Sequence, residues 1–255
     1  MTPGTSTSFH DHFSDGSRAY AAARPTYPDA LYRFIASAAP STARAWDCAT
    51  GNGQAARGLA KYFESIEATD ASAAQVAAAG AHAHVHYSVA PAEATPFRDA
   101  SFDAVCVAQA LHWFDQEAFH REVRRVLKPR GVFAAWGYDG MRVLGEFDDL
   151  FRRVVLEPIR PLWPPQNQLL WRGYVDLPFP YERIAAPRFA VEVRWTFAQL
   201  MDYLATWTAV KRHIAQGHPA FLAEVADALV PSWRSEGPRR IVMPLHVLCG
   251  RRRDD

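Results

Sequence analysis

The sequence predicts an α/β protein with a mostly parallel sheet, helices on both faces of the sheet and an antiparallel last strand. Three observations indicate this class. Strand and helix patterns alternate four or five times before residue 140, residues 102–108 form a nearly continuous apolar run, and residues 241–249 alternate again near the end. Prolines and aromatic residues crowd the chain after residue 140, which predicts a helical cap inserted over a pocket.

Each element follows from a local pattern. Short apolar or alternating segments that end at turn residues predict seven strands, over 43–47, 65–70, 84–89, 102–108, 132–138, 189–196 and 241–249. Apolar residues at helical spacing, alanine-rich runs and capping residues predict helices over 28–39, 54–61, 72–79, 147–159, 197–214 and 219–229. A further helix is expected between a cap at Asp115 and a stop at Pro129.

No repeat or linker divides the chain, so one domain is expected over 1–255. Within it we expect an N-terminal segment (1–40), a ligand-binding core (41–140), a cap and insertion (141–235), and a last strand with a tail (236–255).

Composition narrows the possible partners. The formal net charge is +1, which does not favour nucleic acid, and no apolar stretch approaches the roughly 18 residues of a membrane span. Cys48, Cys106 and Cys249 are few and far apart, as expected of reduced thiols in the cytoplasm. We therefore expect a cytoplasmic monomer or homodimer that acts on a small molecule.

Two glycines follow the first expected strand. Gly51 and Gly53 allow a sharp turn, and Asp70 at the tip of the next strand can accept hydrogen bonds from both hydroxyls of an adenosine ribose. This spacing also fits a dinucleotide-binding fold. Asp47 favours S-adenosylmethionine instead, because a carboxylate beside the turn would repel a doubly charged pyrophosphate. The alternative role for Asp47 is to cap the amides of the turn itself.

These features resemble those of the class I S-adenosylmethionine-dependent methyltransferases. The likeness covers residues 25 to about 138, in motifs at 47–53, 68–72, 90–97, 101–114 and 127–133. It implies a Rossmann-like seven-stranded sheet and methyl transfer that leaves S-adenosylhomocysteine.

The resemblance also implies which residues bind the cofactor. They are Asp47, Ala49, Gly51, Gly53, Asp70, Ala71, Ala92, Glu93 and Gln109. Two positions depart from the family pattern. Ala49 stands where the first of three glycines is usual, and Pro91 replaces an acid that commonly contacts adenine.

Segment 20–28 and segment 109–114 narrow the resemblance to small-molecule methyltransferases that include trans-aconitate methyltransferase. In that subgroup the N-terminal segment covers the cofactor, so Tyr20 and Arg24 are expected at its carboxylate. His112 is the candidate catalytic residue; it would orient the acceptor or take its proton, or else be a packed side chain.

We expect a small, anionic acceptor, with carboxylates favoured because they need no general base. Its candidate contacts are aromatic walls and cations, namely Trp113, Trp171, Arg172, Trp207 and Lys211. Two other functions stay open: a nicotinamide-dependent oxidoreductase and a non-catalytic module that binds S-adenosylmethionine. The alternating histidines at 82–86 have no further ligands at metal spacing, so no metal is expected.

Overall fold

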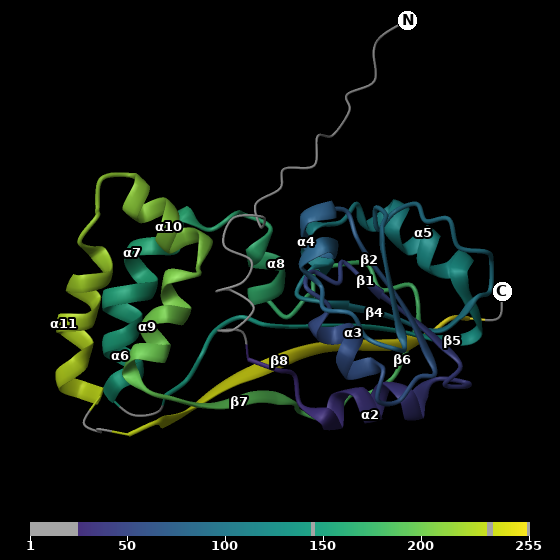
Figure 1. The fold of residues 1–255 in the computed structure, drawn as a ribbon, viewed down its shortest axis with the longest axis horizontal. Helices are drawn as coiled ribbons and strands as arrows, with labels where there is room; N and C mark the ends of the chain where they lie inside the picture. Colours follow the sequence, from purple (N-terminus) through teal and green to yellow (C-terminus); the bar gives the residue numbers. More distant parts are fainter. Residues whose placement is uncertain (1–24, 144–145, 234–236, 254–255) are drawn as a thin grey trace, which may run out of the picture.

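The computed structural model describes residues 25–143, 146–233 and 237–253. These residues form two lobes side by side, an α/β core and a helical cap (Figure 1). The cap contains α6, α7, α9, α10 and α11, and α8 lies between the lobes.

The core is built on a mixed sheet in the order β3-β2-β1-β4-β5-β8-β6. Its strands are β1 (Arg44–Cys48), β2 (Ser65–Asp70), β3 (Val85–Val89), β4 (Phe102–Ala108), β5 (Leu127–Tyr138), β6 (Glu182–Arg183) and β8 (Arg239–Arg251). The first five strands pair in parallel, and β8 runs antiparallel to β5 and β6. The predicted Rossmann-like class with an antiparallel last strand is confirmed.

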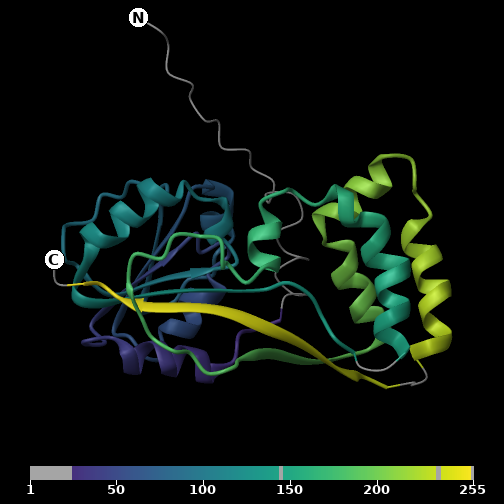
Figure 2. The same ribbon diagram turned by 180° about the vertical axis from the view of Figure 1, so that it is seen from behind.

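The far edge of the sheet differs from the prediction in two respects. The two-residue strand β6 was not expected, and β7 (Ala190–Trp195) lies off the main strand order and pairs with β8. β7 pairs with residues 239–244 of β8, whereas β5 pairs with residues 245–251. β8 is long enough to pair with β5 along one part and with β7 along the other, and it crosses from the cap to the core (Figure 2). An alternating pattern predicts a strand but not its partner.

Helices cover both faces of the core sheet, as predicted. They are α2 (Asp29–Ala38), α3 (Gln54–Leu59), α4 (Ala73–Ala78) and α5 (Gln116–Val126). α2 and α3 belong to one apolar cluster, and α5 to a second cluster across the sheet. The Asp115 carboxylate accepts a hydrogen bond from the amide of Ala118 at 3.1 Å, which confirms the predicted cap of α5.

The helices of the cap are α6 (Glu146–Phe151), α7 (Glu157–Ile159), α9 (Phe197–Ala205), α10 (Thr208–Ala215) and α11 (Phe221–Trp233). The helix between the lobes is α8 (Asn167–Trp171). A π-helical turn, Arg152–Leu156, joins α6 to α7, and a 3₁₀ turn, Arg160–Leu162, follows. The helix expected over 197–214 is broken in two, because Trp207 is extended and the Thr206 hydroxyl donates to the Tyr203 carbonyl at 2.6 Å.

One apolar cluster runs through both lobes. It contains Leu31 of α2 and Trp136 of β5 together with Phe147 and Trp233 of the cap. Within the cap, the Phe147 and Trp233 rings meet edge to face with centroids 5.4 Å apart. The cluster as a whole joins apolar side chains of the cap to those of the core, and it thereby positions the space between the two lobes.

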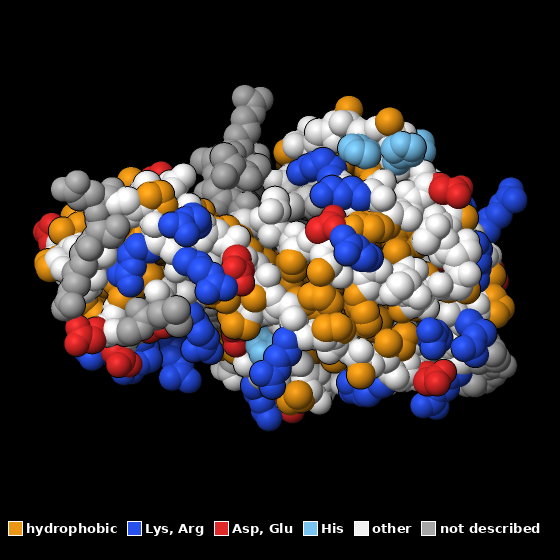
Figure 3. All heavy atoms as spheres, turned by 90° about the horizontal axis from the view of Figure 1, so that it is seen from below, with side chains coloured by type: hydrophobic (Ala, Val, Ile, Leu, Met, Phe, Trp, Pro, Cys, Tyr) orange, Lys and Arg blue, Asp and Glu red, His pale blue; other side chains and the backbone are white. Residues whose placement is uncertain are grey.

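The face seen from below mixes basic and acidic side chains around an apolar area of the core (Figure 3). Within the described ranges no helix is both long and apolar enough to cross a membrane.

Candidate active site

The glycine turn lies between β1 and α3, at the carboxyl end of the parallel strands. Ligands bind at this edge in open α/β sheets. Ala49, Gly51 and Gly53 all have left-handed backbones, with φ of 56°, 56° and 81°. A Cβ on Gly53 would lie 2.2 Å from the hydroxyl oxygen of Tyr87, so a side chain has no room there. The turn therefore brings bare backbone to the ligand edge of the sheet.

Asp47 is fully buried directly behind this turn. Its Oδ2 accepts a hydrogen bond of 2.6 Å from the Thr50 hydroxyl. Burial is the main cause that raises the pKa of Asp47 to about 7, and the negative charge of Asp70 acts in the same direction. Asp47 thus bonds to a side chain of the turn, and the alternative role of capping the amides of the turn stays a prediction.

Asp70 connects the turn to the tip of β2. Its Oδ2 accepts from the Gly51 amide at 2.8 Å, and its Oδ1 accepts from the Ser72 amide at 2.9 Å. A carboxylate at this position offers acceptors of the kind that ribose hydroxyls need. Ala71, the next residue, is exposed. Two carboxylates at one turn suit a ligand with an ammonium and a sulfonium better than a pyrophosphate.

Three further cofactor candidates lie at the ends of neighbouring segments. Ala92 is buried, and the Glu93 carboxylate accepts from the Asp115 amide at 3.2 Å. Gln109 has a left-handed backbone (φ 59°) immediately after β4, and its Nε2 donates to the Tyr138 carbonyl at 3.5 Å. The sequence motifs thus come together at the carboxyl ends of β1, β2 and β4. Tyr20 and Arg24, the other two candidates, lie outside the described residues.

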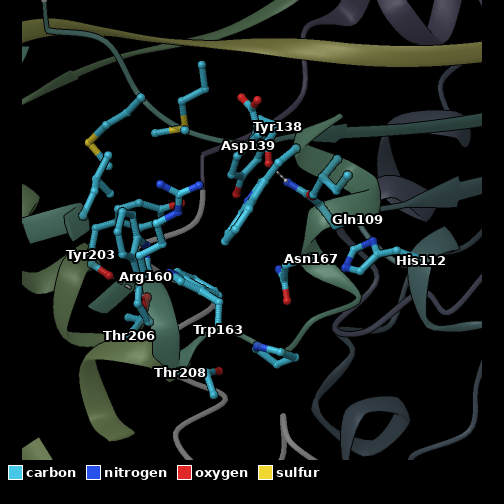
Figure 4. Close-up of a pocket in the computed structure, with 18 of the residues that line it drawn as sticks. Gln109, His112, Tyr138, Asp139, Arg160, Trp163, Asn167, Tyr203, Thr206 and Thr208 are labelled. Carbon is cyan, nitrogen blue, oxygen red and sulfur yellow. Dashed lines mark hydrogen bonds between the residues drawn. The ribbon is translucent and has the colours of Figure 1, made fainter. Parts of the chain in front are cut away.

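A pocket of about 490 Å³ opens beside this edge, between the core and the cap. Its size is typical of small-molecule sites. Gln109, His112 and Tyr138 line it from the core, whereas Arg160 and Trp207 line it from the cap. Figure 4 shows the labelled core and cap side chains on opposite sides of the pocket.

Aromatic rings form much of the cap wall. The Trp163 centroid lies 6.1 Å from that of Trp171 and 5.7 Å from that of Trp207, and Tyr203 lies 5.7 Å from Trp207. All four residues line the pocket. Such a wall presents a large apolar surface to a bound molecule.

His112 occupies the 3₁₀ turn Leu111–Trp113 that follows β4. Its side chain lines the pocket but is only 5% exposed, and its Nδ1 lies 3.4 Å from the hydroxyl oxygen of Tyr174. Burial lowers the pKa of His112 to about 4, so the imidazole is neutral near pH 7. Trp113 lies beside it in the pocket lining, with ring centroids 5.0 Å apart.

The predicted acceptor residues divide into two groups. Trp113, Trp171 and Trp207 line the pocket. Arg172 and Lys211 do not; Arg172 is exposed and forms an ion pair with Asp176 at 3.0 Å. These two cations are therefore not among the residues that line the pocket.

Arg160 is the residue that sequence reasoning missed. It lines the pocket, and across the described ranges it forms no ion pair, whereas the other lining arginine, Arg152, pairs with Glu157. Arg152, Leu156 and Arg160 are spaced four residues apart, and this spacing could have predicted that they share one face of a helix. The sequence did not show that this face meets the pocket.

The histidine run has local hydrogen-bond partners. His84 lies with its Nδ1 3.0 Å from the Glu64 carbonyl oxygen. Groups of three or more potential metal ligands are absent among residues that the structure describes.

Comparisons with known proteins point in one direction. A family profile described as a methyltransferase domain matches residues 46–135. A solved structure from Anaeromyxobacter dehalogenans, assigned to the type II methyltransferases, is 41% identical and superposes with a TM-score of 0.86, covering 91% of this chain and 99% of that one.

Two curated relatives agree. A methyltransferase from Mycobacterium tuberculosis is 31% identical over 64% of this chain and 71% of its own length. A Dictyostelium discoideum protein assigned as a methyltransferase is 27% identical over 97% of both chains. These relatives do not favour the nicotinamide alternative. None of them is named as a trans-aconitate enzyme, so the narrower resemblance stays a prediction.

Proposed function

Because this chain belongs to the class I S-adenosylmethionine-dependent methyltransferases, we propose that it methylates a small anionic molecule bound between the core and the cap. When bound, S-adenosylmethionine supplies an electrophilic methyl group on a sulfonium. Asp70 would hold the ribose, and the turn from Ala49 to Gly53 would accommodate the amino-acid part.

The observation that carries the anionic acceptor is the guanidinium of Arg160. It lines a pocket that also contains several aromatic rings and two acids, and it has no acidic partner among described residues. The two acids, Asp139 and Glu157, are paired with His246 and Arg152. The Arg160 side chain is exposed, and its planar guanidinium can donate two parallel hydrogen bonds to a carboxylate. The aromatic wall of Trp163, Trp171 and Trp207 would enclose the body of the acceptor and exclude water.

The chain's own contribution to the reaction is then alignment. A carboxylate held by Arg160 from the cap and oriented by His112 from the core is placed between the two lobes. Holding the two reactants in one geometry removes much of the entropic barrier of a bimolecular step.

The cofactor is tested first, by thermal shift with S-adenosylmethionine, S-adenosylhomocysteine, NADH and NADPH at equal concentration. A ligand at a hundred times its Kd stabilises by ~2.7 kcal/mol, which is a shift of roughly 5–10 °C. We expect shifts with the two sulfur nucleotides only. A shift with a nicotinamide nucleotide would contradict the assignment.

The acceptor is tested next, by release of S-adenosylhomocysteine with a panel of small carboxylates, phenols and amines. We expect turnover among the carboxylates, and no turnover with any compound would support the non-catalytic alternative. Arg160→Gln should raise the KM of the acceptor by about 10-fold or more while the Kd of S-adenosylmethionine is unchanged. Arg172→Gln is the matched control, because Arg172 lies outside the pocket lining. Equal effects in both variants would refute the role of Arg160.

A further inference from the structure

The hydroxyl of Tyr174 is buried next to His112, a residue that lines the pocket. Tyr174 follows α8, has a left-handed backbone (φ 61°) and is 1% exposed. A Cβ added to Gly137 of β5 would lie 3.1 Å from its hydroxyl oxygen, which shows how closely the strand approaches. The hydroxyl is therefore held in place and shielded from bulk water.

A buried hydroxyl group needs an acceptor for its proton. Across the described part of the chain, the hydrogen-bond partner of the Tyr174 hydroxyl is Nδ1 of His112, at 3.4 Å. The two rings are stacked at an interplanar angle of 29°. If His112 carried its proton on Nδ1, the Tyr174 oxygen would accept that proton's hydrogen bond, and the buried tyrosine proton would have no acceptor among the described residues. The satisfied arrangement has Tyr174 donating to an unprotonated Nδ1.

We propose that Tyr174 is a positioning residue that holds His112 in its Nε2–H tautomer, so that His112 offers the methyl acceptor a hydrogen-bond donor and not a general base. A neutral imidazole protonated on Nε2 has no lone pair there to take a proton. The burial that lowers the pKa of His112 to about 4 keeps the ring neutral, so the choice of tautomer decides its role.

This tautomer defines the class of acceptor, an inference that rests on the proposed methyl transfer. The acceptor must carry an oxygen that is already ionised near neutral pH, as a carboxylate does. Transfer forms a bond between that oxygen and the methyl carbon, and it breaks the bond between the carbon and sulfur, whose electron pair stays on sulfur. The acceptor has no proton to lose, and the product is a methyl ester. Phenols and alcohols would lack the base that they need.

The tautomer itself is measured without any ligand, by two-dimensional ¹⁵N–¹H NMR of the histidine rings in the full-length protein at pH 7. The His112 signals are assigned from their loss in His112→Gln. We expect the protonated nitrogen to be Nε2 in the wild type, and a mixture of tautomers in Tyr174→Phe. Tyr181→Phe is the matched control, because it removes a hydroxyl 2.8 Å from Nδ1 of His120, a buried pair outside the pocket lining. A wild-type His112 protonated on Nδ1 would overturn the proposal.

Kinetics with a carboxylate acceptor test the consequence. The amide nitrogen of glutamine can replace an Nε2–H donor but cannot act as a base. We therefore expect His112→Ala to lower kcat/KM by about 10- to 100-fold, and His112→Gln to recover most of that loss. Glutamine as inactive as alanine would refute the donor role. Turnover failing with every acceptor would contradict the proposed function, while the NMR result on the tautomer would still stand.

Discussion

Ala49 offers a direct test of how the glycine turn is built. It is an alanine with φ of 56°, a conformation that costs an L-residue with a Cβ about 1–2 kcal/mol. Glycine adopts this conformation without that cost but loses about 0.5–1 kcal/mol more backbone entropy on folding. The balance predicts that Ala49→Gly stabilises the protein by ~0.5–1 kcal/mol, or roughly 1–4 °C in Tm.

The same substitution should improve the ligand site. Removing the Ala49 methyl lets the backbone approach a ligand more closely, and we expect the Kd of S-adenosylmethionine to fall about two- to fivefold. Ala100→Gly is the matched control, because Ala100 has a φ of 49° on an exposed turn just before the amino end of β4, whereas the cofactor residues lie at the carboxyl ends of the strands. It should gain similar stability with no change in Kd.

Differential scanning fluorimetry and isothermal titration calorimetry on the three proteins separate these effects. A lower Tm for Ala49→Gly would show that the left-handed backbone at this position is not a source of strain. Tighter binding in both glycine variants would show that the gain in affinity comes from general stability and not from the turn.

Three other predictions concern the site and its support. In calorimetry, Asp70→Ala should weaken S-adenosylmethionine binding by ~10- to 100-fold, because charge-assisted hydrogen bonds worth ~1.5–3 kcal/mol are lost. An unchanged Kd would mean that the ribose binds elsewhere. Burial lowers the pKa of His112 and of His120 to about 4 from an ordinary 6.5. Between pH 6.5 and 4 the unfolded chain therefore binds more protons than the folded protein. Urea titrations should show that the free energy of unfolding falls as the pH drops over this range. If His120→Gln left the dependence of that free energy on pH unchanged, the contribution of His120 would be refuted. Gly137→Ala places a Cβ 2.6 Å from Leu170 and should cost about 1–3 kcal/mol in denaturant unfolding. An unchanged free energy of unfolding would show that Leu170 and its neighbours give way without cost.

Much of the core was determined by local sequence patterns. The parallel strands and the helices around them follow from apolar periodicity and from caps such as Asp115, which depend on residues close together in the chain. The glycine turn and Asp70 were also predictable, because the carboxyl ends of parallel strands meet at one edge, and the structure joins them through the Gly51 amide.

The tertiary structure decided which side chains face the pocket. Arg160 lines it while Arg172 and Lys211 do not, although all three are cations in the part of the chain after residue 140. Tyr174 meets His112 across 62 positions of sequence, and β7 pairs with the extension of β8. These contacts depend on how the cap packs against the core, and packing between segments distant in the chain leaves no periodic trace in either one.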